Sequence, residues 1–334
     1  MKLIQLIHPN HRRRIAVVDQ NSLELITSEF SSNYELFSKM ITEQSSADKF
    51  IPNVLTGEKL DYDQVYTSNS KWKILPAFDH PASPLHCILS GTGLTHKASA
   101  ENRQKMHQQL KKEEITDSMK MYLLGEEGGK PGKGIVGVQP EWFYKGTGTS
   151  LKAHGDLLEI PPYADDGGEE PEIAGIYLVA EDGSPYKVGY AQANEFSDHV
   201  MERKNYLYLA PSKLRQCAIG PELILDHDFQ DITGNVEIRR NGKKVWSETI
   251  KTGEQNMCHS VENLEHHHFK YEQHRIPGTV HIHFYGADAF SFGEGLRLKG
   301  GDQMIVSFKG FGRELVNTVS DKRKIVKPVR VNLI

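Results

Sequence analysis

Three glutamates in two short segments have the residue type and the spacing of a metal site. Glu170 and Glu172 stand two apart at the start of the apolar run EEPEIAGIYLVA, and Glu195 follows a second apolar run, YKVGYAQAN. Residues two apart on a strand share a face, so the first two carboxylates would point the same way. Carboxylate oxygens are the ligands that hard divalent cations prefer. A solvated acidic turn is the alternative interpretation of the same residues.

A hairpin would bring the third glutamate back to the first two. The turn sequence EDG at 181–183 separates the two apolar runs, which predicts two antiparallel strands. The end of the second strand would then lie beside the start of the first, and Asp198 follows close behind. A three-carboxylate magnesium site becomes geometrically possible. Lys213, further along, is a natural counter-charge for an anionic substrate, against the alternative of an ordinary surface lysine.

Histidines form two other groups that need an interpretation. His266, His267 and His268 are consecutive, and consecutive helix residues lie about 100° apart round the axis, so they cannot all face one ion. We expect one of them to pack inward and the others to lie on the surface. His281 and His283 alternate on a predicted strand and share a face, a geometry that can hold a metal or simply pack in the core.

The elements that must position these residues are mostly short strands. Alternating apolar patterns and turn signals predict strands at 85–94, 172–180, 186–194, 235–240, 243–250, 279–286 and 303–312. A hairpin is expected at 13–28, and helices at 33–44, at 100–124 as one or two helices, and at 260–275. Many short strands with few helices favour a β-rich barrel or roll over a βαβ repeat.

Composition excludes several classes of protein. The 334 residues carry a formal net charge of −4, which argues against a dedicated nucleic-acid binder. No apolar run approaches the length of a membrane span, and the N-terminus lacks the features of a signal peptide. The glycine-rich segment 125–137 lacks the Ser or Thr of a phosphate-binding loop. Three scattered cysteines predict neither a disulfide scaffold nor a zinc ribbon and make a reducing cytoplasm the default expectation. Three prolines near residue 80 place a domain boundary there, between residues 1–80 and 85–334.

The order of the motifs resembles the fumarylacetoacetate hydrolase superfamily. GLTHKASAENR resembles its first active-site loop, PEWFYKGTGTSL its lysine segment with Lys145, and EEPEIAGIYLVA its metal-binding E-x-E strand. GYAQANEFSDH, SKLRQCAIGPEL, FYGADAFSFGEG and GGDQMIVSFKGFGRELVN resemble the later segments in the same order. The resemblance spans about residues 85–320. Each motif alone is weak, but together they are fairly specific.

The first loop is most similar to a sugar-acid branch of that superfamily, which includes 2-keto-3-deoxy-aldonate dehydratases. Gly93, Thr95, Ser99 and Arg103 match its G-x-T-x-x-x-S-x-x-x-R pattern. The family's carbon–carbon hydrolases carry a His–Glu pair in this loop. The glutamate can be matched to Glu101, but the histidine position falls on alanine or serine.

The resemblance implies a mixed α/β, β-rich fold: a mixed β-sheet roll with a small α+β N-terminal domain, usually as a homodimer. It implies a divalent metal, with magnesium first and manganese or calcium as alternatives, and a small-molecule 2-keto acid substrate without nucleic acid or membrane. The residues implied are Glu170, Glu172 and Glu195 for the metal, Glu101, Ser99 and Lys213 for catalysis, and Thr95, Arg103, Lys145, Lys213 and Gly286 for the substrate.

The function implied is dehydration of a 2-keto-3-deoxy sugar acid, a pentonate, to a 2-keto semialdehyde such as 2-oxoglutarate semialdehyde. Glu101 is the candidate base, with Ser99 as a group that could position a water. Arg103 either binds substrate or anchors its loop. The first alternative is a hydrolase that cleaves a carbon–carbon bond in a 2,4-diketo acid, with His96 as the water-activating group. The second is a sugar-acid-binding protein without catalysis.

Overall fold

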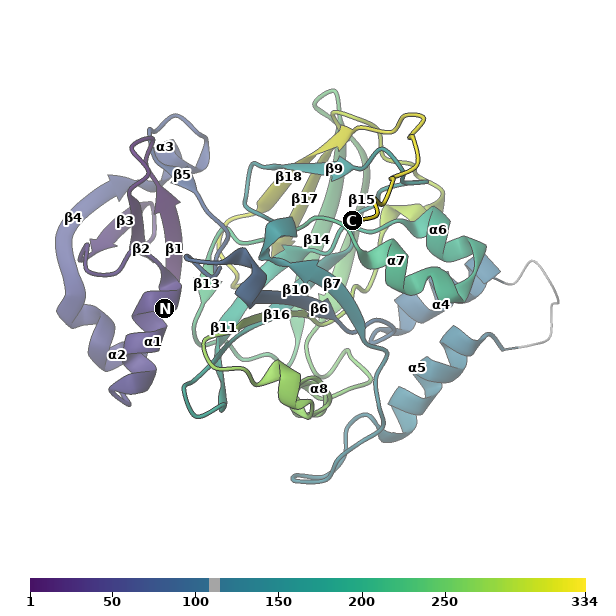
Figure 1. The fold of residues 1–334 in the computed structure, drawn as a ribbon, viewed down its shortest axis with the longest axis horizontal. Coiled ribbons are helices and arrows are strands. Elements are labelled where there is room, and N and C mark those ends of the chain that lie inside the picture. The colour runs from purple at the N-terminus through teal and green to yellow at the C-terminus, as the bar shows by residue number, and fades with distance from the viewer. Residues whose placement is uncertain (108–114) are drawn as a thin grey trace.

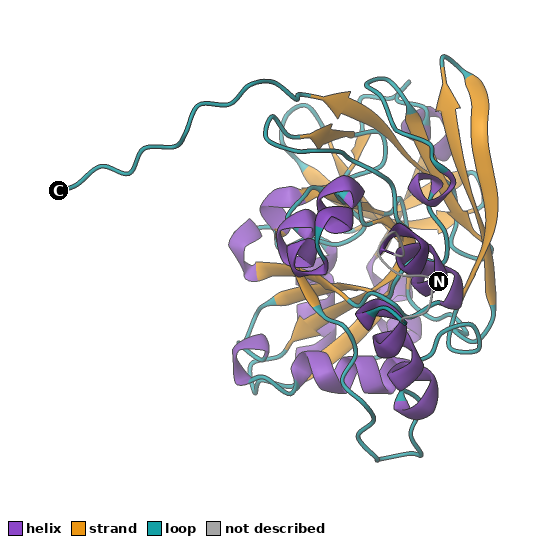
Figure 2. Cartoon of the chain, turned by 90° about the vertical axis from the view of Figure 1, so that its right-hand side faces the viewer, coloured by secondary structure: helices purple, strands orange, loops and turns teal. Residues whose placement is uncertain are grey.

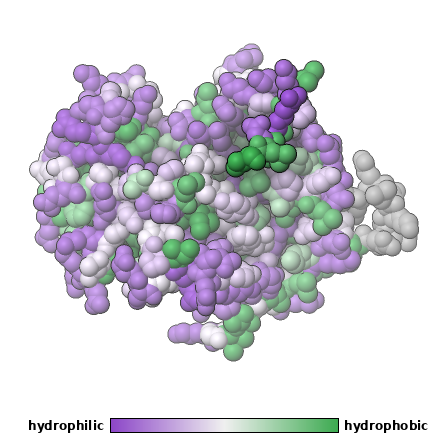
Figure 3. All heavy atoms as spheres, viewed as in Figure 1, coloured by the Kyte–Doolittle hydropathy of each residue, from purple (hydrophilic) through white to green (hydrophobic). Residues whose placement is uncertain are grey.

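The computed structural model describes residues 1–107 and 115–334 and has a mixed α/β architecture rich in strands (Figure 1). Among the described residues, the strands form one sheet of thirteen and one of five. Helices α4 (Lys97–His107), α5 (Asp117–Gly128), α6 (His199–Lys204) and α7 (Leu209–Lys213) gather on one side of the sheets, at the right of Figure 1. The surface seen in Figure 3 is mostly hydrophilic, with apolar side chains in small groups. No described helix has the length and apolar character needed to cross a bilayer.

The larger sheet joins the N-terminal strands to the central ones. β1 pairs with β13 through Leu3↔Leu223, so residues 1–80 extend the central sheet, and the predicted boundary near residue 80 stays a prediction. In spatial order the strands are β4 (Leu55–Asp61), β3 (Ser22–Ile26), β2 (Arg13–Asp19), β1 (Lys2–Ile7), β13 (Leu223–Ile224), β11 (Pro185–Asn194), β10 (Pro171–Val179), β16 (Val280–Phe284), β6 (Cys87–Gly91) and β7 (Phe143–Thr147), with β5 (Lys73–Ile74), β8 (Leu151–Lys152) and β12 (Cys217–Ile219) beside this row.

The N-terminal elements follow the sequence signals closely. The predicted hairpin at 13–28 is confirmed as β2 and β3, which close through Asp19↔Ser22. Helix α1 (Asn33–Thr42) begins after Ser32, whose side chain caps its first turn, and it buries Leu36 and Met40. The short helices α2 (Ala47–Phe50) and α3 (Tyr62–Tyr66) complete this part of the chain.

The predicted hairpin of β10 and β11 is confirmed at the centre of the molecule. The two strands pair antiparallel from Val179↔Pro185 at the turn to Pro171↔Asn194 at the open end. β10 also pairs with β16, so it has neighbours on both edges, and every residue along it is buried. A strand enclosed in this way holds the groups at its ends in fixed positions.

The smaller sheet packs against the larger one. Its order is β15 (Lys243–Thr252), β14 (Ile232–Arg240), β17 (Gln303–Phe308), β18 (Leu315–Asp321) and β9 (Leu157–Ile160). Val236 and Met304 of this sheet share one buried cluster with Ile173 and Tyr190 of β10 and β11. This shared core fixes the hairpin relative to the second sheet.

Most of the remaining helices lie toward the open end of the hairpin, whereas the helix at 261–269 lies near its turn end. The predicted helical segment 100–124 contains α4 (Lys97–His107) and α5 (Asp117–Gly128), and its middle, 108–114, lies outside the described residues. α6 (His199–Lys204) and α7 (Leu209–Lys213) follow β11. α8 (Val261–Phe269) is shorter than the predicted 260–275. Its histidines correct one expectation: two of them, His267 and His268, are buried, because this face of α8 packs against the molecule.

Candidate metal centre

Three buried carboxylates meet at the open end of the β10–β11 hairpin. Glu170 precedes β10, Glu172 is its second residue, and Glu195 follows β11, where its N–H donates to the Glu170 carbonyl oxygen at 2.9 Å. A ligand oxygen from each side chain lies within 4.8 Å of the others, and all three residues are buried. The hairpin therefore brings the three predicted metal ligands together.

Two buried lysines balance part of this negative charge. Lys145 of β7 lies 2.6 Å from Glu195 Oε1 and donates to the Phe196 carbonyl oxygen at 2.5 Å. Lys213, at the end of α7, donates to Glu170 Oε1 at 2.5 Å and to Glu195 Oε2 at 2.6 Å. Burial by itself would lower the pKa of Lys213, but its two carboxylate partners outweigh burial and raise that pKa. The two carboxylates therefore favour the charged form of Lys213.

Glu172 is the least compensated of the three carboxylates. It accepts the backbone N–H of Gly286 at 2.7 Å, and it makes no ion pair within the described part of the chain. Gly286 has φ +97°, and a Cβ there would stand 2.0 Å from Thr95 Oγ1. Only glycine fits this position, because the backbone must approach both the carboxylate and the threonine.

The charges favour a bound cation. Burial, followed by repulsion from Glu195 and Glu170, raises the pKa of Glu172 well above the ordinary glutamate value. For Glu170, the nearby Lys213 and His199 outweigh burial and lower the pKa. Three carboxylates thus face two lysines, and the uncompensated one points into the cluster. A divalent cation takes oxygen ligands of this kind, and it would supply the missing positive charge.

His199 is a site residue that the sequence interpretation missed. Its Nε2 lies 3.0 Å from Glu170 Oε1, and its ring stacks on Phe290 with centroids 4.7 Å apart. Burial opposes protonation, but the hydrogen bond to Glu170 outweighs it and raises the pKa of His199. His199 directly follows Asp198 in the segment GYAQANEFSDH, which resembles the family. Its position in that motif could have identified it as a candidate site residue.

The other acidic residues near the cluster have separate structural partners. Glu169 accepts the N–H of Ser291 at 2.6 Å and its hydroxyl at 2.9 Å. Asp198 caps α6 and pairs with Arg215 at 3.0 Å. Glu169 and Asp198 therefore fix the backbone of the loops that carry Glu170 and Glu195.

The first loop and α4 place the remaining predicted residues. The Thr95 hydroxyl donates to the Tyr285 carbonyl oxygen at 2.7 Å, beside Gly286. Ser99 is buried near the start of α4. Glu101 is exposed, with Oε1 3.9 Å from the Lys97 ammonium, so the structure does not bring it to the glutamate cluster.

Arg103 is buried between two carboxylates of neighbouring elements. Its Nη1 donates to both oxygens of Glu141 at 3.0 and 2.9 Å, and its Nε lies 2.7 Å from Glu202. A guanidinium held in this way ties α4 to the segment before β7 and to α6. Two roles were expected for Arg103, and these contacts support the one in which it anchors its loop.

The histidines of β16 do not share a metal position. His283 has Ser90 and Thr92 hydroxyls at 2.9 and 2.8 Å from its two ring nitrogens, and His281 Nδ1 lies 2.9 Å from His268 Nε2. In residues 1–107 and 115–334, the glutamate cluster is the one group of three or more possible ligands close enough to share an ion. The structure therefore agrees with the interpretation that His281 and His283 pack in the core.

His96 is buried between two threonine hydroxyls. Its Nδ1 lies 2.9 Å from Thr95 Oγ1 and its Nε2 3.2 Å from Thr252 Oγ1. Burial lowers the pKa of His96 to about 3. Burial therefore favours the neutral form of this histidine.

Solved structures of a dehydratase and of isomerases share the overall fold of this chain. A structure of 2-keto-3-deoxy-D-arabinonate dehydratase complexed with magnesium and 2,5-dioxopentanoate matches with a TM-score of 0.70 at 18% identity, over 97% of this chain and 100% of that chain. A 2-hydroxyhepta-2,4-diene-1,7-dioate isomerase from Mycobacterium marinum matches with a TM-score of 0.57 at 15% identity, over 97% and 100%. The expected mixed α/β fold is confirmed.

Curated relatives point to the same branch. A probable 2-keto-3-deoxyxylonate dehydratase of Haloferax volcanii is 28% identical over 131 residues, 38% of this chain and 43% of the relative. A 2-dehydro-3-deoxy-D-arabinonate dehydratase of Saccharolobus solfataricus is 29% identical over 122 residues, 34% of this chain and 39% of the relative. These matches span less than half of each relative. No family model matches the sequence. The resemblance to sugar-acid dehydratases is thus confirmed by the relatives themselves.

Proposed function

We propose that this protein is a metal-dependent dehydratase of a 2-keto-3-deoxy sugar acid, a pentonate, with a 2-keto semialdehyde such as 2-oxoglutarate semialdehyde as product. The observation that carries the proposal is the buried set of Glu170, Glu172 and Glu195 with two lysines. This cluster lies in a fold that the chain shares with a dehydratase whose structure holds magnesium and 2,5-dioxopentanoate. Magnesium is the cation that we assign to the three glutamates, with manganese and calcium as alternatives.

A cation held by these glutamates would supply Lewis-acid chemistry for a 2-keto acid. Glu170 and Glu195 raise the pKa of Lys213, which favours its charged form beside the substrate. Lys145 is buried in the same cluster, and we assign both lysines to the carboxylate or the leaving oxygen of the substrate. These groups are buried, and burial strengthens each charge interaction.

Dehydration needs a base for the proton on the carbon beside the ketone. We keep Glu101 as the proposed base and Ser99 as the proposed group for positioning a water. Glu101 points to solvent beside Lys97, so this role requires the start of α4 to turn toward the cluster when substrate binds. Thr95 and Gly286, which meet next to Glu172, are proposed substrate contacts, and Arg103 is proposed to hold α4 in place.

The test is a product mass spectrum. The protein is incubated with magnesium and with 2-keto-3-deoxypentonates, and separately with 2,4-diketo acids. Loss of one water from a keto-deoxy acid supports the dehydratase. Hydration and cleavage of a diketo acid would instead establish the carbon–carbon hydrolase, and binding of either acid without turnover would establish a sugar-acid-binding protein.

A control variant links any turnover to the cluster. Glu170→Ala removes a proposed ligand and should abolish both metal binding and dehydration. Lys204→Ala breaks an exposed pair with Asp165 and should leave turnover unchanged.

We also propose a cytoplasmic location and a homodimer. The three cysteines are all free and buried, which agrees with a reducing compartment.

A further inference from the structure

The ring of His199 is held in place from several sides. His199 is the first residue of α6, one of the helices on the side of the sheets that faces the viewer in Figure 2. The buried ring stacks on Phe290 at an interplanar angle of 14°, and the Phe292 ring lies 5.0 Å away between centroids. Gly168 lies against the ring, because a Cβ there would stand 2.4 Å from Nδ1. These contacts fix the direction in which Nε2 points.

Within the described residues, the hydrogen bond of this ring goes to Glu170 alone. An ionised carboxylate accepts and does not donate, so Nε2 carries the hydrogen and donates to Glu170 Oε1 at 3.0 Å. Nδ1 is buried and has no partner in residues 1–107 and 115–334. A buried polar atom without a partner costs free energy, so its presence in a folded protein needs a reason. The contact that the structure offers as this reason is the one with Glu170.

The donors around Glu170 and Glu172 leave one oxygen of each carboxylate free. Glu170 Oε1 accepts from both His199 and Lys213, at 3.0 and 2.5 Å, and no donor of the described chain meets Oε2. Glu172 Oε2 accepts the Gly286 N–H at 2.7 Å, and no donor in the same ranges meets Oε1. Each of these carboxylates is therefore set to bind a cation through a single oxygen.

Both oxygens of Glu195 already have a cationic partner. Oε1 lies 2.6 Å from the Lys145 ammonium, and Oε2 accepts from Lys213 at 2.6 Å. A contact of both oxygens with one ion would have to displace a lysine. All three glutamates thus offer a cation their oxygens one at a time.

Oxygens offered singly distinguish between divalent cations. Mg²⁺ demands a near-ideal octahedral shell, keeps several waters and takes single oxygens from carboxylates. Ca²⁺ takes about six to eight oxygens and commonly binds a carboxylate through both of its oxygens. A carboxylate whose second oxygen is engaged by hydrogen-bond donors does not provide that second contact. The arrangement therefore favours the smaller ion.

We propose that His199 is a positioning residue that commits Glu170 to one ligand oxygen and thereby makes the metal centre select Mg²⁺ over Ca²⁺. His199 acts through Glu170, and we assign it no contact with the ion or the substrate. This inference rests on the proposed function, of which the metal centre is a part. It separates magnesium from calcium among the cations named there.

Calorimetric titration of the full chain with Mg²⁺ and with Ca²⁺ tests the proposal without a measurement of turnover. The unchanged protein should bind Mg²⁺ more tightly. His199→Leu removes a partner of a metal ligand and should weaken Mg²⁺ binding about 10- to 100-fold. Ca²⁺ binding should weaken less, because Glu170 Oε1 then has one donor in place of two and is freer to join the calcium shell. The ratio of the two affinities should therefore fall.

His199→Gln is the conservative variant. Its amide nitrogen can donate from nearly the position of the histidine Nε2, so the Mg²⁺ affinity and the ratio should stay close to those of the unchanged protein. A glutamine variant that behaves like the leucine variant would overturn the hydrogen bond to Glu170 as the cause.

Gly168→Ala displaces the ring and leaves His199 in the chain. The new methyl group would stand 2.4 Å from Nδ1, so the ring must move and its hydrogen bond to Glu170 must weaken. The ratio of affinities should fall as it does in His199→Leu. Gly128→Ala is the matched control for crowding, because its Cβ would stand 2.6 Å from the Val138 side chain. Equal ratios in the two alanine variants would contradict the proposal.

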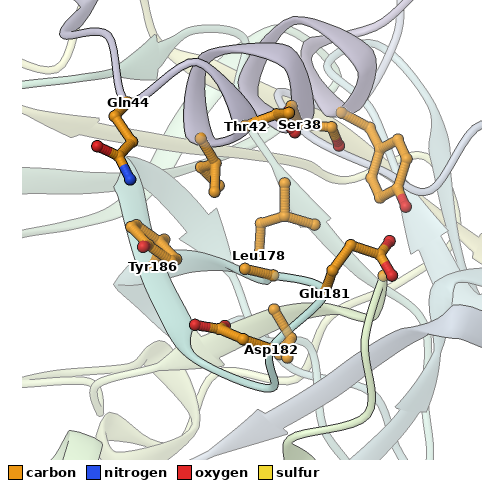
Figure 4. A pocket seen from close by; sticks show the side chains of 12 residues that line it. Ser38, Thr42, Gln44, Leu178, Glu181, Asp182 and Tyr186 are labelled. Atoms are coloured by element: carbon orange, nitrogen blue, oxygen red, sulfur yellow. The ribbon is translucent and has the colours of Figure 1, made fainter.

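A second control separates the metal centre from other acidic groups. Glu181 and Asp182 line a cavity of about 300 Å³ at the turn end of the β10–β11 hairpin, opposite the end that carries the glutamate cluster (Figure 4). Glu181→Gln with Asp182→Asn should leave both affinities unchanged. Loss of Mg²⁺ binding in this variant would overturn the placement of the ion at the cluster.

The outcomes distinguish this inference from the proposed function. An affinity ratio that His199→Leu does not change, or tighter binding of Ca²⁺ by the unchanged protein, would overturn the role of His199 and leave the dehydratase standing. Absence of binding of either ion to the unchanged protein would overturn the metal centre and this inference with it. Circular dichroism establishes that each variant is folded.

Discussion

At the residue scale, the site is governed by one uncompensated carboxylate. Glu170 and Glu195 have lysine partners, whereas Glu172 has a single backbone N–H and two negative neighbours. Its raised pKa means that the folded protein holds a proton on Glu172 more tightly than the unfolded chain does. The favourable contribution of that proton is complete at a pH below the ordinary glutamate range. It is lost as the pH rises through the folded-state pKa.

Glu172→Gln tests this imbalance. Without metal, we expect the variant to be more stable than the unchanged protein near neutral pH, with a flatter dependence of stability on pH, because the amide never ionises. Magnesium affinity should fall about 100-fold or more, since one ligand is lost. Thermal unfolding between pH 4 and 8 and calorimetric magnesium titration measure the two effects. Glu170→Gln is the matched control: it takes a partner from Lys213, so stability without metal should fall.

A second prediction concerns the buried lysine. Lys213→Met leaves Glu170 and Glu195 without their shared cation, and removal of one partner from a buried ion pair costs about 3–5 kcal/mol. Urea unfolding in the presence of a chelator measures this loss. Magnesium should recover part of it, because the ion replaces the missing charge. An unchanged urea midpoint would show that the lysine does not stabilise the carboxylates.

At the element scale, the loop after β16 holds Glu172. Tyr285 accepts the Thr95 hydroxyl through its carbonyl oxygen, and its ring hydroxyl pairs with that of Tyr177 on β10. These contacts fix the next residue, Gly286, whose N–H meets the carboxylate. The loop after β16, strand β10 and the loop that contains Thr95 therefore meet at Gly286.

Gly286→Ala tests that coupling. The new methyl group would stand 2.0 Å from Thr95 Oγ1 at φ +97°, so the loop must shift and the N–H must leave Glu172. We expect a stability loss of about 1–3 kcal/mol together with weaker magnesium binding. Gly295→Ala controls for backbone strain, since φ there is +87° and nothing lies within 4 Å of the added Cβ. Equal magnesium affinities in the two variants would contradict the coupling.

At the scale of the whole molecule, the site joins elements that are distant in sequence. The open end of a central hairpin supplies the three glutamates, while β7 and α7 supply the lysines. The shared core behind the hairpin links the two sheets. We therefore expect a ligand of this cluster to stabilise the global fold and not only a local loop.

Metal addition should accordingly raise the stability of the entire molecule. At a free magnesium concentration 100 times the dissociation constant, the expected gain is about 2.7 kcal/mol in a single cooperative transition. Scanning calorimetry with and without a chelator measures it, and the Glu172→Gln variant should show almost none of the gain. A gain confined to one of two separate transitions would indicate that the N-terminal part unfolds independently.

The sequence by itself determined the local elements and the grouping of the three glutamates. Alternation and turn residues place the hairpins of β2–β3 and β10–β11, because a period of two and a tight turn are encoded by adjacent residues. The spacing of Glu170 and Glu172, with that hairpin, was enough to predict where Glu195 would lie. The edge strand β4, with its exposed residues, lacks such a pattern and was not predicted.

The tertiary structure decided which residues share the site. His199 reaches Glu170 because α6 turns back after β11, while Glu101 faces solvent and Arg103 is held by Glu141 and Glu202. His267 and His268 are both buried because of how α8 packs. Each outcome depends on which carboxylate or surface from a distant segment lies opposite the side chain. Such pairings leave no periodic trace in the sequence, since they depend on the packing of whole elements and not on neighbouring residues.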